Sequence, residues 1–347
     1  MLWPLSLVYR AVIGIRKLAY RTGLKKTYRA PVPVVIVGNI YIGGTGKTPV
    51  ILSLIEGLRS RGWRPGLISR GYGSHPKQAP VCGQGRLEVS EFGDEPAMIS
   101  LKTGIPVSVH PDRPLAAQTL LRFDPSIDVI LSDDGLQHWA LARDIELLVQ
   151  DERGIGNGMT LPAGPLREPP SRSHEVDAVL TRQTLPDFTG SRHIDFAPPS
   201  GDEPAQASFC LNITEFQCVA SGSRLTAPAF VRLTAGRPDG LLAIAGIGVP
   251  ERFFASLRLI GVRPTRTQAL PDHGHIEQDW LSKQPEGTIL MTEKDAVRLS
   301  GQLHSGTGTN HSDRRLWFAI ARTEWRSPDF MDWISQRLHA VAACRRK

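Results

Sequence analysis

The chain has 347 residues, of which 41% are hydrophobic and 22% charged, a composition typical of a soluble globular protein with room for two domains. The four cysteines form no CxxC pair and no Cys/His metal spacing, which indicates reduced thiols in a cytosolic compartment. The net charge of +7 is confined to one end, because seven of the 41 Lys and Arg lie in residues 1–30, which hold no acid. The other 34 basic residues balance 34 acidic ones, and this neutral body argues against a nucleic-acid-binding protein.

Residues 1–30 are predicted to form a basic amphipathic helix. At about 100° per residue, one face gathers the apolar side chains: Leu5, Val8, Val12, Ile15 and Ala19. The opposite face carries Arg10, Lys17 and Arg21. Because basic residues interrupt the apolar ones, the segment fits neither a signal peptide nor a transmembrane helix. We expect it to bind an anionic membrane surface. The alternative is a helix packed on the domain with its charges in water.

Beyond residue 30, strand-like and helix-like stretches alternate. Apolar runs typical of buried parallel strands occupy residues 33–40, 65–73, 105–110, 127–138, 145–151 and 176–182. Helical periodicity is found between them, over residues 47–62, 93–104 and 112–123. In the second of these helices, Asp94 is expected at the N-cap. The alternation predicts an α/β fold with a doubly wound, mostly parallel sheet.

The alternation is lost over residues 186–238, which we interpret as linker strands or an insertion. A second α/β unit follows, with strands expected at 240–248, 288–292 and 316–321 and helices at 250–260, 293–299 and 328–342. The sequence therefore predicts four segments: an N-terminal membrane-associating segment 1–30, a core 31–185, a linker 186–238 and a smaller C-terminal α/β subdomain 239–347.

The run "VGNIYIGGTGKTP" has the form of a phosphate-binding loop between a strand and a helix. Glycines let the backbone N–H groups approach phosphate oxygens, the lysine adds a charge, and the following hydroxyl ligates Mg²⁺. The predicted nucleotide-binding residues are Gly43, Gly44, Thr45, Gly46, Lys47 and Thr48. Tyr41 stands where the usual pattern has its first glycine. The alternative is a strand, turn and helix with no ligand.

A second acidic element and several possible acid–base groups accompany this loop. "DVILSDDG" places Asp133 and Asp134 at the end of a predicted strand, where they can hold Mg²⁺, unless Asp-Asp-Gly merely forms a turn. The groups that can orient and deprotonate an acceptor hydroxyl are Asp94, Glu95, His138, Asp272, His273 and His275. Residues 157–172 form a long loop, which we expect to be a binding surface or lid, or else a solvated crossover.

Seven motifs in order, "VGNIYIGGTGKTP", "SRGYG", "GDEP", "DDGLQH", "LPAGPLRE", "DHGH" and "TEKD", closely resemble the tetraacyldisaccharide 4′-kinase family. They span about residues 31–298. The resemblance implies a P-loop fold with a smaller C-terminal subdomain. It also implies ATP-dependent phosphorylation of the 4′-hydroxyl of a tetraacyl glucosamine disaccharide 1-phosphate in lipid A biosynthesis. The enzyme would work peripherally, at the cytoplasmic face of the bacterial inner membrane. The family normally lacks the first loop glycine, so Tyr41 is no objection.

The resemblance also implies roles for individual residues. Lys47 and Thr48 would hold phosphate and Mg²⁺, and Asp94 and His273 would form the dyad that activates the acceptor hydroxyl. The groups expected around the metal and the γ-phosphate are Glu95, Asp133, Asp134, Gln137 and His138. The groups expected to face the disaccharide or the transferring phosphate are Asn157, Arg167 and Glu168. The dyad would meet only on closure of the two subdomains, which would exclude water.

The alternative among enzymes is a P-loop GTPase or ATPase switch, or a metallochaperone. A GTPase would be expected to show Asp-x-x-Gly and Asn-Lys-x-Asp, whereas this sequence has Asp133-Asp134-Gly135 and "TEKD". The partners expected are therefore a lipid disaccharide and an anionic membrane surface, with no nucleic acid.

Overall fold

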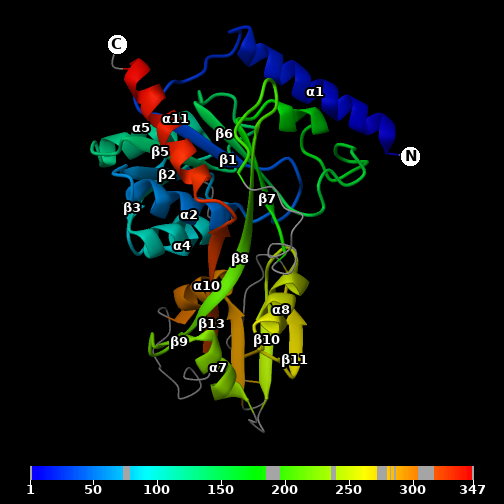
Figure 1. The fold of residues 1–347 in the computed structure, drawn as a ribbon. Helices are drawn as coiled ribbons and strands as arrows, with labels where there is room; N and C mark the ends of the chain where they lie inside the picture. The colour runs from blue at the N-terminus through cyan, green and yellow to red at the C-terminus, as the bar shows by residue number, and fades with distance from the viewer. Residues whose placement is uncertain are drawn as a thin grey trace. The chain divides into compact units, whose positions relative to one another are not determined.

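The structure is a computed structural model that describes most of the chain: residues 2–72, 79–184, 196–235, 240–271, 280–281, 283–284, 287–303 and 316–345, with the backbone alone at 300–303. Within these ranges, no helix is long and apolar enough to cross a membrane. The chain divides into two compact units, Met1–Cys210 with Thr323–Lys347 (unit 1) and Leu211–Arg322 (unit 2). Figure 1 labels most of their helices and strands.

Unit 1 holds the elements of the predicted core. Its helices are α1 (Trp3–Arg21), α2 (Lys47–Arg59), α3 (Val89–Phe92), α4 (Asp94–Thr103), α5 (Arg113–Phe123), the short 3₁₀ helix η1 (Pro170–His174) and α11 (Asp329–Arg345). Its strands are β1 (Val34–Gly38), β2 (Pro65–Ser69), β3 (Val81–Gln84), β4 (Pro106–Val109), β5 (Val129–Asp133), β6 (Ile145–Gln150) and β7 (Ala178–Arg182). Two further strands, β8 (Ala205–Cys218) and β13 (Leu316–Trp325), each contribute one end to unit 1 and the rest to unit 2.

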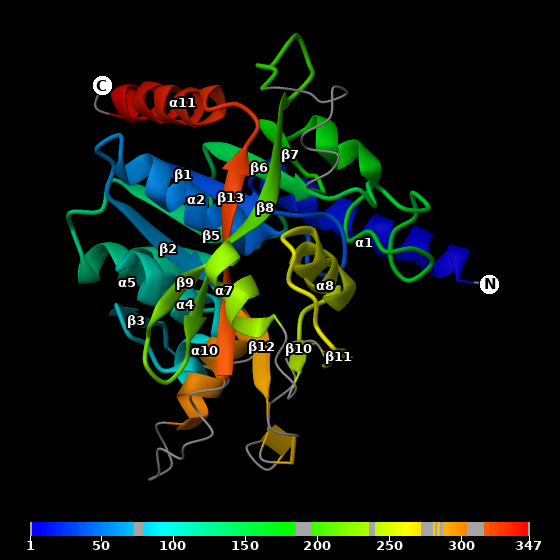
Figure 2. The ribbon, with the colours of Figure 1, turned by 60° about the horizontal axis from the view of Figure 1, so that its bottom comes forward.

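The unit 1 sheet runs in the order β8-β7-β6-β1-β5-β2-β4-β3. Every neighbouring pair is parallel except β3 with β4. Helix α2 carries the chain from β1 to β2, and α5 carries it back from β4 to β5, so right-handed crossovers require the two helices on opposite faces. Figure 2 shows β2 lying between α2 and α5. The doubly wound α/β fold predicted from the alternation is confirmed.

The core explains why β1 and β5 read as uninterrupted apolar runs. Every residue of both strands is buried, as expected for central parallel strands covered on both faces. Val34 and Ile36 of β1 share one core cluster with Ala117 and Leu120 of α5. Because β1 is sequestered in this way, the loop that follows it starts from a rigid base.

Unit 2 is a smaller α/β unit. Its elements beside β8 and β13 are β9 (Arg224–Thr226), α7 (Ala227–Thr234), β10 (Leu241–Ala245), α8 (Pro250–Leu259), β11 (Arg266–Ala269), β12 (Thr288–Thr292) and α10 (Glu293–Leu303). Its sheet runs in the order β11-β10-β12-β13-β8, with β9 pairing to β8. Two apolar clusters, one around Phe230 and Phe254 and one around Ile244 and Met291, form its core.

The described units divide the chain differently from the four expected segments. The N-terminal helix belongs to unit 1, and so does the terminal segment Thr323–Lys347. That segment is attached to α2, because Thr323 Oγ1 donates to the Pro49 carbonyl at 2.9 Å and Trp325 Nε1 donates to Ser53 Oγ at 2.7 Å. The stretch expected as linker strands contains the 14-residue strand β8.

Candidate active site

The loop after β1 has the backbone of a phosphate cradle. Gly43 and Gly46 have φ angles of 95° and 99°, a region that favours glycine, and Gly46 is the N-cap of α2. A side chain on Gly46 would also reach 3.4 Å from the Arg182 side chain. Inside the loop, the buried Asn39 amide donates to the Gly43 carbonyl at 3.2 Å and to Thr45 Oγ1 at 3.1 Å. The N–H groups at the start of α2 are therefore held ready for an anion.

Residues 40–42 lead from β1 into the phosphate loop and form its entry limb. This limb pairs with the segment between β6 and β7. The Arg167 N–H donates to the Ile40 carbonyl at 2.7 Å, and the Ile42 N–H donates to the Pro165 carbonyl at 2.9 Å. Tyr41 lies between these two bonds, and the Arg153 guanidinium stacks 4.4 Å from its ring centroid. Because the limb is extended and paired, a tyrosine is accommodated where the usual pattern has its first glycine.

Lys47 is held by a carboxylate from the neighbouring strand end. Its Nζ lies 3.3 Å from Asp134 Oδ1, and Arg167 Nη1 lies 2.7 Å from Asp134 Oδ2. Asp134 has a φ of 50° although it is not glycine, so its backbone is strained where β5 ends. Burial opposes ionisation of Asp134, but Lys47 and Arg167 more than offset it, and the pKa of this carboxyl is lowered. It therefore stands as a carboxylate between two cations.

Thr48 and Asp133 form an oxygen-rich corner beside Lys47. Thr48 Oγ1 donates to Glu95 Oε2 at 2.8 Å, which brings the first turn of α4 to the start of α2. Burial, followed by the charges of Glu95 and Asp134, raises the pKa of Asp133 to about 7. Ser69 donates to one oxygen of Asp133 at 3.2 Å, whereas Asp133 Oδ1 is buried without a hydrogen-bond partner.

This corner fits Mg²⁺. The ion binds in proteins through one or two carboxylates, with water and phosphate oxygens completing its shell. The Thr48 hydroxyl, the Glu95 carboxylate and the orphaned oxygen of Asp133 are hard donors of that kind. Among the residues that the structure describes, no group of three or more His, Cys, Asp or Glu is arranged as a self-sufficient metal site. The chemistry therefore suits an ion that arrives with phosphate.

Gln137 and Glu168 lie directly behind the loop. Gln137 Nε2 donates to the Asn39 carbonyl at 3.2 Å and to Glu168 Oε1 at 2.6 Å. Burial raises the pKa of Glu168, against the opposing effects of Arg172 and Gln137.

The imidazole of His138 is neutral at physiological pH. Burial, with Arg113 and Arg70, lowers its pKa to about 4.

Most of the predicted residues that the structure describes lie around the loop at Lys47. Asp94 begins α4 next to Glu95, but the N-cap is Gly93 and makes no side-chain cap bond, so the expected capping by Asp94 is wrong. Asn157 bonds within its own loop, to the Ala163 carbonyl at 3.1 Å and the Met159 N–H at 3.0 Å. His273 lies outside the described residues, so its predicted place in the dyad stays a prediction.

Two buried residues contribute to the site without having been predicted. Asn39 organises the loop from within, and its position two residues after the apolar run of "VIVGN" is a usable signal. Arg113 is 1% exposed and donates to the Asp133 carbonyl at 2.9 Å, beneath the paired carboxylates. Burial, against the pull of Asp133 and Asp134, lowers the pKa of Arg113 to about 10. Nothing in its local sequence distinguishes it from a surface arginine.

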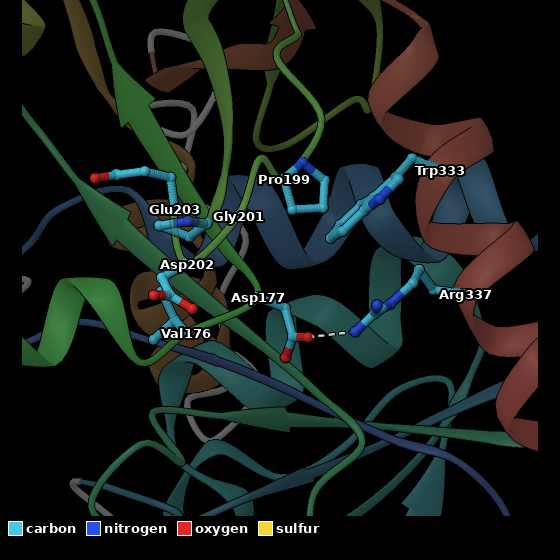
Figure 3. A pocket seen from close by; sticks show the side chains of 9 residues that line it. Val176, Asp177, Pro199, Gly201, Asp202, Glu203, Trp333 and Arg337 are labelled. Carbon is cyan, nitrogen blue, oxygen red and sulfur yellow. Dashed lines mark hydrogen bonds and ion pairs between the residues drawn. The ribbon is translucent and has the colours of Figure 1, made fainter.

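A separate cavity of about 170 Å³ lies in unit 1 between the start of β7, the turn at residues 199–204 and α11 (Figure 3). An ion pair between Asp177 and Arg337 lies in it, and Asp202 and Glu203 add two further acids. Three carboxylates against one guanidinium would repel a phosphate group. The cavity therefore does not compete with the loop at Lys47 as a nucleotide site.

Fold and site together define a P-loop phosphotransferase: a parallel sheet with a glycine loop, its lysine and threonine, and acids at the neighbouring strand end. A family model described as tetraacyldisaccharide-1-P 4′-kinase (LpxK) matches residues 1–339. The chain belongs to this family. The lipid A 4′-kinase activity in lipopolysaccharide biosynthesis that the motifs predicted is thereby confirmed.

Relatives match over nearly the whole length. A tetraacyldisaccharide 4′-kinase of Bordetella parapertussis is 46% identical over 98% of this chain and 92% of its own. One of Pseudomonas aeruginosa is 41% identical over 99% of this chain and 94% of its own. A crystal structure described as the "apo" form of LpxK from Aquifex aeolicus in complex with ATP shares the fold. It has a TM-score of 0.76 and 24% identity over 97% of this chain and 98% of that one.

Proposed function

We propose that the chain transfers the γ-phosphoryl group of ATP to the 4′-hydroxyl of a tetraacyl glucosamine disaccharide 1-phosphate, with the loop at residues 43–48 as the phosphate site. One observation carries this proposal. Lys47 and Thr48 begin α2 within contact of Asp134 and Glu95, so cation, hydroxyl and carboxylates converge on the place where a terminal phosphate would lie. The ATP bound to the Aquifex aeolicus protein supports the choice of nucleotide.

The chain's own groups would bind and orient the nucleotide. The N–H groups of Gly44 to Thr48 would cradle phosphate oxygens, because the glycine φ angles turn the backbone around the anion. Lys47 would exchange its contact with Asp134 for a phosphate oxygen. Asp134 would then keep Arg167, whose guanidinium lies at the same corner and can hold the phosphate that is transferred.

Thr48, Glu95 and Asp133 would hold Mg²⁺. When bound, the ion would neutralise the phosphate charge that develops during transfer. Burial first, and then the charges of Glu95 and Asp134, raise the pKa of Asp133 to about 7. Since a bound cation favours the ionised carboxylate, metal binding would release the proton of Asp133 at neutral pH.

Asp94 and His273 would activate the acceptor. Asp94 is half-buried at the start of α4, one residue before Glu95. A carboxylate there would take the proton of a sugar hydroxyl that approaches the γ-phosphate, and the imidazole of His273 would orient or share that proton. Asn157 and Glu168 are proposed, with Arg167, to face the acceptor.

The lipid acceptor would be reached from the cytoplasmic face of the inner membrane, through α1. The helix turns its apolar face outward: Leu5, Val8, Val12, Ile15 and Leu18 are all exposed. Exposed side chains of this size on one helix face are typical of an interfacial helix that lies in the headgroup region of a bilayer. The charge of residues 1–30 would add attraction to anionic lipid.

The test uses purified protein with ATP, Mg²⁺ and the disaccharide 1-phosphate lipid in detergent, with Lys47→Ala as the matched inactive variant. We expect phosphate on the 4′-oxygen of the lipid with wild type, and a loss of at least about 100-fold in kcat with the variant. Equal consumption of ATP with and without the lipid would contradict the proposal, and so would normal transfer by Lys47→Ala.

A further inference from the structure

The loop at residues 159–168, which we name the bridging segment, lies between α1 and the phosphate loop. Figure 1 shows α1 alongside the loops between β6 and β7. Ser6 of α1 is buried, its Oγ donates to the Thr160 carbonyl at 2.8 Å, and it accepts from the Ala163 N–H at 3.0 Å. The helix is therefore bonded to the bridging segment by specific polar contacts.

The same segment is bonded on its other side to the entry limb of the phosphate loop. Tyr9 of α1 donates its hydroxyl to the Arg167 carbonyl at 3.2 Å, and the Arg167 N–H donates to the Ile40 carbonyl at 2.7 Å. The Ile42 N–H, one residue before Gly43, donates to the Pro165 carbonyl. A single residue, Arg167, thus contacts α1 with its carbonyl and the phosphate-loop limb with its N–H. Its guanidinium contacts Asp134.

A second chain of contacts starts about two helical turns further along α1. Lys17 pairs with Glu175, and Glu175 Oε2 lies 3.7 Å from Nη1 of the buried Arg172. The Trp139 ring gathers the cations of this cluster, with Lys17 Nζ at 5.2 Å, the Arg172 guanidinium at 5.2 Å and that of Arg143 at 4.5 Å from its centroid. Such stacking fixes long, flexible side chains that would otherwise lose order in water.

From Arg172 the contacts lead to the phosphate loop. Arg172 Nε lies 3.3 Å from Glu168 Oε2, both side chains being 2% exposed. Glu168 Oε1 accepts from Gln137 Nε2, which also donates to the Asn39 carbonyl. Asn39 in turn holds Gly43 and Thr45. Buried ion pairs of this kind have few alternative arrangements, because an unpaired buried charge is costly.

The face of α1 that makes these contacts is not its apolar face. Ser6, Tyr9 and Lys17 lie on one side of the helix, and the exposed apolar side chains lie on the other. Helix docking onto the protein here depends on polar contacts rather than on burial of the apolar stripe. The helix can therefore bind a lipid surface and the bridging segment at the same time.

We propose that Tyr9 and Lys17 are positioning residues that, through the bridging segment and the Glu175–Arg172 pair, hold Arg167 and the entry limb of the phosphate loop in place. The inference rests on the proposed function for its catalytic consequence. Its structural content, the order of the limb at Ile40–Ile42, does not depend on which substrate is phosphorylated.

The experiment compares the double variant Tyr9→Phe/Lys17→Gln with Arg10→Gln, in detergent without any membrane. Arg10 is exposed on the same helix, so its variant also removes one positive charge from α1. Amide hydrogen exchange of the full chain is followed at Ile42 and Arg167, whose N–H groups make the two bonds to be loosened. We expect exchange there to be faster by about 10-fold in the double variant and within about twofold of wild type in Arg10→Gln.

Transfer assays of the same proteins supply the functional readout. We expect kcat to fall by about 5- to 20-fold in the double variant, as for the loss of one or two hydrogen bonds, with a smaller change in KM for ATP. Restoring the charge with Tyr9→Phe/Lys17→Arg should recover part of kcat. Unchanged exchange within β5 in every variant would show that the fold is intact.

Three results would overturn the proposal. They are unchanged exchange at Ile42 and Arg167 in the double variant, an equal loss in Arg10→Gln, and faster exchange with kcat unaltered. A wild-type protein that transfers no phosphate to the lipid would instead contradict the proposed function. The exchange measurement would still decide whether α1 orders the phosphate loop.

Discussion

Asp133→Asn is expected to make the metal-free protein more stable at about pH 8. The pKa of this carboxyl stands at about 7 in the folded chain instead of 3.8. Between these values the folded state keeps a proton that the unfolded state has lost, so the free energy of unfolding falls as pH rises through this window. Above it, both states are ionised and the folded state bears the full cost of the buried charge.

The size of the effect follows from this difference in proton affinity. Each tenfold change in the acid dissociation constant is worth about 1.4 kcal/mol. The difference between a pKa of about 7 and one of 3.8 therefore gives, as an upper bound at pH 8, a gain of about 4 kcal/mol in the free energy of unfolding. The charges of Lys47 and Arg113 lower the pKa of Asp133, and the value of about 7 already includes their effect. Local relaxation reduces the observable gain to about 1–2 kcal/mol, because buried sites behave as if their effective dielectric constant were near 20. An asparagine keeps an oxygen to accept the bond from Ser69 Oγ.

The assay is urea unfolding without Mg²⁺ at about pH 5 and about pH 8, with Asp134→Asn as the matched control. The two variants should shift stability in opposite directions. The pKa of Asp134 is lowered by Lys47 and Arg167, so its removal leaves two cations unpaired and costs about 1–3 kcal/mol. The gain in the free energy of unfolding from Asp133→Asn, relative to wild type, should shrink toward zero at acidic pH. A loss in both variants, or a gain that does not change with pH, would refute the reasoning.

Three further predictions concern the remaining site residues. Thr48→Ala should raise the Mg²⁺ concentration needed for half-maximal activity about 10-fold or more, whereas Thr48→Ser should stay near wild type, and a Mg²⁺ titration of the initial rate distinguishes them. Asp94→Ala and His273→Ala should each lose most of kcat with ATP affinity nearly intact, and normal turnover in both would remove the dyad. The imidazole resonances of His138 should stay at their neutral positions as pH falls through 6.5 toward about 4, whereas titration near 6.5 would contradict the buried environment. Since the unfolded chain binds that proton first, His138 should also lower stability as pH falls through this range.

The fold and the phosphate loop were predictable because their signals are local. Apolar runs such as residues 33–40 and 127–138 mark fully buried strands, and the glycine spacing before Lys47 reports a backbone that must turn around an anion. Strand ends were less certain. The run at 127–138 stops as a strand at Asp133, because the strained backbone of Asp134 turns the chain away.

What the sequence hides is which surfaces meet. Periodicity shows that Val8 and Val12 share a face of α1, but not that the polar face with Tyr9 is the one that docks. The loop at 157–172 has no periodicity at all, and its contacts with Ile40 and Ile42 join segments more than 120 residues apart. The buried arginines Arg113 and Arg172 are likewise indistinguishable from surface ones until the fold surrounds them with carboxylates.

The central claim is that the loop at Lys47 delivers phosphate to a lipid hydroxyl and not to water. It is tested most directly by following γ-labelled ATP with purified wild-type protein in the presence and absence of the disaccharide 1-phosphate lipid. The account predicts that the label appears on the 4′-oxygen of the lipid, with little free phosphate when the lipid is left out. Rapid release of labelled phosphate without lipid, and no labelled lipid with it, would contradict the account.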